Sequence, residues 1–99
     1  MTAAAQTPAV IHRPDAGRFE VVVDGQRCVA DYQMIDQVMW MTHTEVPTAL
    51  NGRGLAARLV ATALDHARAQ GLKVRPRCSY VAAYMRRHPE TLDLLEAPR

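Results

Sequence analysis

The sequence predicts one mixed α/β (α+β) domain, in which an antiparallel β meander passes into β-α-β-α around one central sheet. Three observations predict this fold class. The dipeptide Asp24-Gly25 separates two strand-like runs and is a strong hairpin signal. A loop with two glycines, 51–54, is followed by apolar residues at helical spacing. A short strand-like run, 72–77, then leads into the helix-like segment "SYVAAYMRR".

The expected elements follow in order along the chain. We expect strands at 18–23, at 26–32 with an extension toward 36, at 38–46 and at 72–77, helices at 53–70 and 79–87, and a last turn at 91–95. Gly71 is a fitting C-terminal cap for the first helix, and Ser79 is the expected N-cap of the second. The strands at 38–46 and 72–77 should be parallel neighbours, because a helix joins them. Ligands of such units bind beyond the carboxyl ends of the strands, which is where the glycine loop lies.

Length and composition indicate a single globular domain. The chain has 99 residues and 48% of them are apolar, which allows one core and no second one. We expect residues 1–9, "MTAAAQTPA", to form a disordered tail and residues 10–97 to form the domain. No apolar run reaches the length of a membrane span, and the first residues lack the pattern of a signal peptide. We therefore expect a cytoplasmic protein without a membrane partner.

Charge is distributed unevenly along the chain. Residues 1–49 hold three basic and six acidic residues, a net charge of −3, whereas residues 50–99 hold nine basic and four acidic residues, a net charge of +5. A basic half beside a glycine loop suits a polyanionic partner, although a solvated arginine-rich surface would have the same composition. The two cysteines and four histidines show no metal-ligand spacing, so we expect no metal site.

The start of the expected first helix, Asn51–Ala56, is a candidate anion site. The amide hydrogens at a helix N-terminus lack intrahelical partners, and glycine lets the backbone approach a ligand closely. Gly52 and Gly54 could instead only shape a tight turn. The loop lacks the Gly-Lys-Ser/Thr of nucleoside triphosphatases and the Gly-x-Gly-x-x-Gly of dinucleotide-binding proteins.

The stretch "VPTALNGRGLA" resembles motif A of the GNAT superfamily of acetyltransferases, Arg/Gln-x-x-Gly-x-Gly/Ala. The match falls on Asn51, Gly54 and Ala56, with asparagine in place of the arginine or glutamine. Together with "HTEVP" and "LKVRPRCSYVAAYMRRHPE", the short length resembles the compact YjdJ-type GNAT-like proteins, over about residues 10–95. This resemblance implies a GNAT-like fold, binding of acetyl-coenzyme A and acetyl transfer to a primary amine such as a protein lysine, a polyamine or a small amine.

The resemblance also implies which residues form the site. The coenzyme would lie between the strands 38–46 and 72–77. The expected cofactor-binding residues are Thr44, Val46, Asn51, Gly52, Arg53, Gly54, Leu55, Ala56 and Arg58. The backbone of Thr44 would donate to the thioester oxyanion, and the positive half of the chain would face the negatively charged coenzyme. A cysteine occurs in the related proteins at the place of Cys78, which would line the site or act as a nucleophile.

Several roles stay open at the level of sequence. His43 and Glu45 are candidate general bases, but strand alternation would put them on the opposite face from Trp40, Thr42, Thr44 and Val46. Cys78 could be a small packed residue instead of a reactive one. The chain could also bind coenzyme A with little turnover, as an interaction protein. A basic nucleic-acid-binding module is the other alternative, although the aromatic residues do not alternate with the basic ones.

Overall fold

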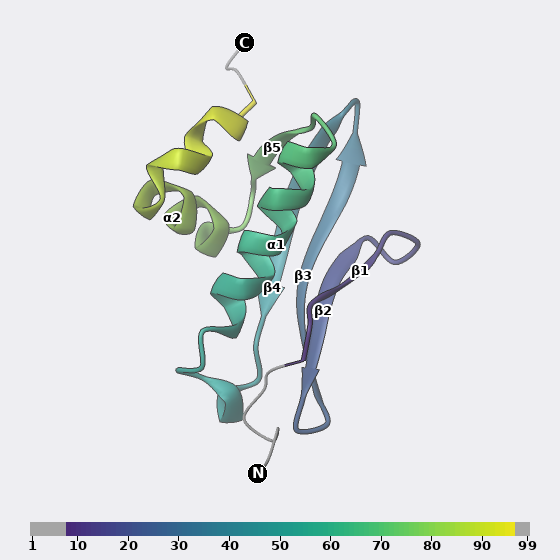
Figure 1. The fold of residues 1–99 in the computed structure, drawn as a ribbon, viewed down its shortest axis with the longest axis vertical. Helices are drawn as coiled ribbons and strands as arrows, with labels where there is room; N and C mark the ends of the chain where they lie inside the picture. Colours follow the sequence, from purple (N-terminus) through teal and green to yellow (C-terminus); the bar gives the residue numbers. More distant parts are fainter. Residues whose placement is uncertain (1–7, 97–99) are drawn as a thin grey trace.

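The computed structural model describes residues 8–96. In this range the chain forms one five-stranded sheet with the strands in sequence order, β1-β2-β3-β4-β5 (Figure 1). The strands are β1 (Ile11–Arg13), β2 (Arg18–Val23), β3 (Gln26–Ile35), β4 (Val38–Glu45) and β5 (Lys73–Pro76). The helices are α1 (Leu55–Ala69) and α2 (Ser79–Arg87), with two short 3-10 helices, η1 (Thr48–Leu50) and η2 (Pro89–Leu94). The predicted mixed fold is confirmed.

β2, β3 and β4 form the expected antiparallel meander, and β1 pairs antiparallel with β2 at its edge. Asp24 and Gly25 both have positive φ angles, 52° and 73°, as a tight hairpin turn between Val23 and its partner Gln26 requires. β3 continues to Ile35, so the predicted extension of the meander is also confirmed. β1 was not predicted, because three residues are too few to show a periodic pattern.

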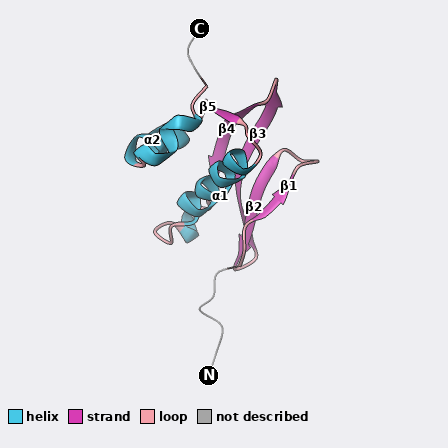
Figure 2. Cartoon of the chain, turned by 45° about the horizontal axis from the view of Figure 1, so that its top comes forward, coloured by secondary structure: helices cyan, strands magenta, loops and turns pink. Residues whose placement is uncertain are grey.

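β4 and β5 are parallel neighbours, as predicted, with residues from Val38↔Lys73 to Met41↔Pro76 in register. α1 connects them and packs on the sheet, and α2 lies on the same side of β4 and β5 (Figures 1 and 2). The core lies between the helices and the sheet. Its largest fully buried side chains include Phe19, Met39, Met41, Leu50, Leu59, Leu64 and Met85. Each such side chain contributes about 1.5–3 kcal/mol by burial.

β4 contains a β-bulge that changes which side chains share a face. Tyr32 pairs with Met41 and Asp31 pairs with His43, so Thr42 is the extra residue of β4. Met39 and Met41 are buried in the core before the bulge, and Val46 packs against the same core after it. The predicted alternation is therefore wrong for Trp40, which lies on the opposite face from Thr44 and Val46. It holds for His43 and Glu45, which lie on the uncovered face together with Trp40.

The helix boundaries differ slightly from those predicted. α1 begins at Leu55 instead of residue 53, because Gly52 and Gly54 have positive φ angles of 85° and 74° and cannot be part of the helix. Gly71, at φ 70°, follows the end of α1 as predicted, and the amide of Leu72 bonds the carbonyl of Ala67. Ser79 is the first helical residue of α2 and not its N-cap, which is Cys78. Residues 1–7 of the expected tail and residue 97 at the expected domain end lie outside the described residues.

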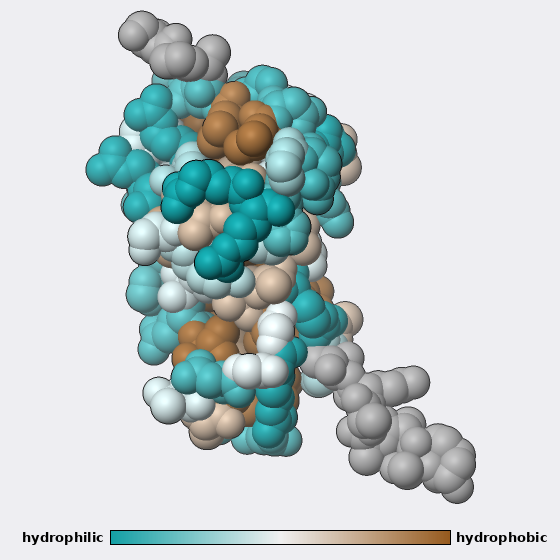
Figure 3. All heavy atoms as spheres, turned by 90° about the vertical axis from the view of Figure 1, so that its left-hand side faces the viewer, coloured by the Kyte–Doolittle hydropathy of each residue, from teal (hydrophilic) through white to brown (hydrophobic). Residues whose placement is uncertain are grey.

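The side of the molecule that carries α2 is mostly hydrophilic, with separate hydrophobic patches and no continuous apolar band (Figure 3). Over residues 8–96, no helix is long and apolar enough to cross a membrane.

Candidate functional site

The candidate site begins where β4 and β5 separate. The amides of Arg77 and Cys78 both donate to the carbonyl oxygen of Met41, at 2.9 and 3.0 Å, and β5 then ends. β4 continues to Glu45, without a strand partner on that side in the described chain. The two strands therefore separate beyond Met41, and we call the space between the second half of β4 and the start of α2 the gap.

The start of α1 faces this gap without a side-chain cap. Gly54 occupies the N-cap position in the left-handed conformation, φ 74° and ψ 18°, and it has no side chain to bond the first amides of the helix. The first turn also contains no acidic residue. The unpaired N–H groups and the positive end of the helix dipole can therefore bind an anion. A β-carbon on Gly52 or Gly54 would meet open space, so both glycines are required by their φ angles and not by close packing.

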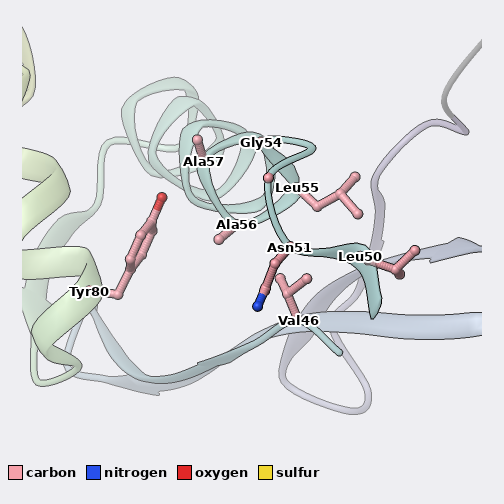
Figure 4. A pocket seen from close by; sticks show the side chains of 9 residues that line it. Val46, Leu50, Asn51, Gly54, Leu55, Ala56, Ala57 and Tyr80 are labelled. Carbon is pink, nitrogen blue, oxygen red and sulfur yellow. The ribbon is translucent and has the colours of Figure 1, made fainter. Parts of the chain in front are cut away.

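A hollow of about 200 Å³ lies beside this helix start (Figure 4). It is lined by Val46, Leu50, Asn51, Gly52, Gly54, Leu55, Ala56, Ala57 and Tyr80. Six of these residues are predicted cofactor-binding residues. The side chain of Val46, which directly follows β4, and that of Tyr80, which belongs to α2, both lie at the hollow. Val46 and Tyr80 come two residues after Thr44 and Cys78, so the hollow continues the gap between β4 and α2.

Cys78 and Thr44 meet at the inner end of this gap. The Sγ atom of Cys78 donates to the Oγ1 atom of Thr44 at 3.6 Å. Burial raises the pKa of the Cys78 thiol, but the amides of Val81, Tyr80 and Thr44 and the hydroxyl of Thr44 favour the thiolate and outweigh burial, so the pKa is lowered. Cys28, in contrast, is buried in the core, where burial raises its pKa.

The two predicted arginines do not line the hollow. Arg53 is exposed, and its guanidinium forms an ion pair with Asp24 in the β2–β3 turn at 3.1 Å. Arg58 is half-buried, and its Nη1 atom is buried without a hydrogen-bond partner among the described residues. Both side chains lie within a few residues of the helix start, so they can add positive charge near it without direct contact in this arrangement.

His43 lies on the uncovered face of the sheet, away from the hollow. Its Nε2 atom is 3.2 Å from Oε1 of Glu45, and both side chains are exposed. On α2, Tyr84 stacks against His88 with ring centroids 3.9 Å apart, and it does not line the hollow. No group of three or more His, Cys, Asp or Glu side chains within residues 8–96 could hold a metal ion.

Three lining residues of the hollow were not predicted. Leu50 belongs to η1, a turn that gave no periodic signal, and it brings a buried side chain beneath the loop. Ala57 is in the first turn of α1, where its small side chain leaves space. Tyr80 belongs to α2 and was not among the predicted site residues. The signal for it was available, because Tyr80 follows Cys78 by two residues.

Comparison with known proteins is decisive for the family. A model of the GCN5-related N-acetyl-transferase family matches residues 18–94. The chain belongs to this family. Protein NATD1 of Mus musculus is 34% identical over 83 residues, which cover 81% of this chain and 76% of that protein. Protein NATD1 of Homo sapiens is 35% identical over 75 residues, which cover 73% and 66%.

A solved structure supports the fold independently. The NMR structure of a GCN5-like protein from Staphylococcus aureus superposes with a TM-score of 0.71, covering 91% of this chain and 89% of that one. At 20% identity this similarity bears on the fold alone. The resemblance to a compact GNAT domain, read from the sequence, is thereby confirmed, and acetyl transfer is the activity at the level of the family.

Proposed function

We propose that this protein binds acetyl-coenzyme A and transfers the acetyl group to a primary amine by direct attack on the thioester. One observation supports this most strongly: the gap that opens after Met41 continues into a hollow at the uncapped start of α1. An elongated ligand with an anionic centre fits such a site, since the hollow offers amide donors at one end and the Thr44–Cys78 contact at the other.

In this proposal the amides of Asn51–Ala56 hold the pyrophosphate of the coenzyme. The arm that carries the thioester lies along β4, from Val46 toward Thr44. The backbone amide of Thr44 then donates a hydrogen bond to the carbonyl oxygen, where negative charge develops during attack. A single donor placed in this way lowers the barrier by about 3 kcal/mol. Arg58, whose Nη1 atom has no hydrogen-bond partner among the described residues, adds positive charge near the phosphate end, whereas the charge of Arg53 is paired with Asp24.

Cys78 lines the acetyl end of the site in this proposal, because the thioester already gives the amine a good leaving group. An acetyl-cysteine would be a second thioester of nearly equal energy and would lower no barrier. The attacking amine must lose a proton, which a general base or water accepts. His43 is the candidate base, since it lies on the uncovered face from which an acceptor approaches, although Glu45 already engages its imidazole.

The acceptor side of the site is open. Among the described elements, no helix covers the face of the sheet opposite α1 and α2, so β4 is uncovered on that side near the gap (Figures 1 and 2). An exposed lysine on a protein can reach such a surface. Nucleic acid fits it less well, because several basic residues are engaged in ion pairs: Arg53 with Asp24, Arg68 with Asp93 and Arg75 with Glu96.

The free thiols of Cys28 and Cys78 suit a reducing compartment, and we propose that the protein works in the cytoplasm. Two measurements test the proposed function. Native mass spectrometry of the purified protein should find coenzyme A bound, and incubation with acetyl-coenzyme A and a lysine peptide should yield acetylated peptide. Coenzyme binding without any transfer would instead indicate a coenzyme-binding interaction protein.

A further inference from the structure

A platform of one tryptophan and two arginines lies on the uncovered face of the sheet, beside the gap. Trp40 of β4 and Arg75 of β5 are direct neighbours in the register of the two strands. Their sequence neighbours Met39 and Val74 are fully buried toward the helices, so Trp40 and Arg75 point to the other face. Arg77 follows Arg75 by two residues and reaches the same ring.

The guanidinium groups of both arginines lie over Trp40. The Cζ atom of Arg75 is 4.7 Å from the centre of the indole, and the Cζ atom of Arg77 is 5.8 Å from it. These are cation–π distances, at which the ring holds each guanidinium in place. We call this group, Trp40 with Arg75 and Arg77, the Trp–Arg platform.

Within the described chain, only one of the two arginines has a charge that is free to bind a partner. Arg75 forms an ion pair with Glu96, with Nη2 2.6 Å and Nε 2.8 Å from Oε1. Arg77 is exposed and forms no ion pair within residues 8–96. On the uncovered face, Asp31 forms an ion pair with Arg18, and the exposed Glu45 carboxylate contacts the imidazole of His43 instead of Arg77. Arg77 therefore leaves a net positive charge at the platform.

The platform lies at the mouth of the site. The amide of Arg77 donates to Met41, the last residue of β4 that pairs with β5. The hollow of the proposed coenzyme opens on the helix side of this point, so an amine that attacks the thioester directly must come from the uncovered side. An acceptor on that side passes Trp40 and Arg77. The positive charge of Arg77 repels basic residues beside the acceptor amine and attracts acidic ones.

We propose that the Trp–Arg platform selects the acceptor, and that the acceptor is a lysine in a segment with aspartate or glutamate on either side. This inference rests on the proposed function. The carboxylates beside the lysine bind the exposed guanidinium of Arg77, which the ring of Trp40 holds in place. An open surface suits an extended peptide, whereas a polyamine would place its further positive charges against Arg77.

The test compares two peptides of equal length, in which one central lysine is flanked by glutamates or by arginines. We expect the wild-type protein to acetylate the acidic peptide with a kcat/KM at least about fivefold higher, as one or two exposed charge pairs would give. Arg77→Glu should abolish or reverse this preference. Arg86→Glu changes the charge equally but lies at the far end of α2, about 10 Å further along the helix, and should retain the preference.

A second readout is independent of turnover. Trp40 is the single tryptophan of the chain, so the fluorescence of the wild-type protein should change when the acidic peptide binds. Addition of the same peptide to the Arg77→Glu variant should leave the fluorescence of that variant unchanged. Equal rates and equal fluorescence titrations for both peptides, or equal effects of Arg77→Glu and Arg86→Glu, would overturn the inference about the platform. Acetyl transfer in that experiment would still support the proposed function. Acidic-peptide binding without any transfer would support the platform and contradict the proposed function. If neither occurs, both are wrong.

Discussion

The Sγ atom of Cys78 lies 3.6 Å from the Oγ1 atom of Thr44, and this contact joins the start of α2 to the end of β4. β5 has already ended at this point, so the two residues face each other across the inner end of the gap. Burial raises the pKa of Cys78, but the backbone amides of Val81, Tyr80 and Thr44 and the hydroxyl of Thr44 favour its thiolate, and together they lower the pKa.

The first prediction concerns the reactivity of Cys78. Because its pKa is lowered, alkylation by iodoacetamide should reach half of its maximal rate at a lower pH than an ordinary thiol requires. Cys28 is the internal control, since burial raises its pKa and should keep it unreactive in the folded protein. Thr44→Val removes one donor at similar volume and should move the midpoint of Cys78 upward. A midpoint at or above that of a free thiol would contradict the described environment.

The second prediction separates two roles of Cys78. Cys78→Ala should keep the affinity for acetyl-coenzyme A and lose less than about tenfold in kcat, because the proposed transfer uses no covalent intermediate. Mass spectrometry of wild-type protein during turnover should find no acetyl group on Cys78. An inactive variant that binds normally, together with an acetyl adduct on Cys78 of the wild type, would show that the thiol is the nucleophile.

Much of the fold could be predicted from local chemistry. The Asp24-Gly25 turn and the apolar spacing of α1 are local signals, and the structure contains both the hairpin and the helix they predict. The bulge at Thr42 could not be predicted in this way, because it depends on how β4 pairs with β3. Alternation within one strand assumes unbroken pairing, and one extra residue reverses the face of every residue after it.

The candidate site could be predicted only where its residues are continuous in the sequence. The loop from Asn51 to Ala56 is a continuous stretch whose glycines and helix start are visible in the sequence. The partners that complete it come from elsewhere: Tyr80 from α2 and Leu50 from η1. The placement of Arg53 was not predictable from spacing, because its partner Asp24 is 29 residues away in sequence.

The third prediction tests a close backbone approach at Gly17. A β-carbon there would lie 2.8 Å from the carbonyl oxygen of Tyr32, and the φ angle is +65°. The amide of Tyr32 also bonds the Gly17 carbonyl at 2.8 Å, so the two segments cannot easily move apart. Gly25 has a similar φ angle of +73° but open space around it. Gly25→Ala should lower the free energy of unfolding by about 1 kcal/mol and Gly17→Ala by roughly twice that or more.

Urea denaturation of the two variants measures this difference. Equal losses of stability would mean that only the φ angle matters and that the contact between Gly17 and Tyr32 relaxes without cost.

The fourth prediction is a loss of stability in mild acid. His12 stacks on Phe19 at 4.2 Å, its Nε2 atom meets the hydroxyl of Tyr32 and its ring contacts His66 of α1. Burial first, and then the charge of His66, lowers the pKa of His12. The unfolded chain therefore binds this proton more readily than the folded one, so the stability due to neutral His12 is complete above about pH 6.5 and falls as the pH decreases below it.

Unfolding free energies at pH 7.5 and pH 5 test this. The wild-type protein should be less stable at pH 5, and His12→Phe, which keeps an aromatic ring against Phe19 but cannot titrate, should show a smaller difference between the two pH values. If His12→Phe loses as much stability as the wild type on acidification, the titrating group is elsewhere.

The most direct test of the central claim is the melting temperature of the protein with and without acetyl-coenzyme A. A ligand that binds only the folded state at about 100 times its Kd stabilises it by about 2.7 kcal/mol, which raises the melting temperature of a domain of this size by roughly 10–20 °C. Gly54→Glu should remove this shift, because a carboxylate would occupy the start of α1. Gly71→Glu, at a similar φ angle of +70° and also in open space, should lower the starting melting temperature comparably but retain the shift. No shift for the wild-type protein at millimolar acetyl-coenzyme A, or an equal shift for both variants, would contradict a coenzyme site at Asn51–Ala56.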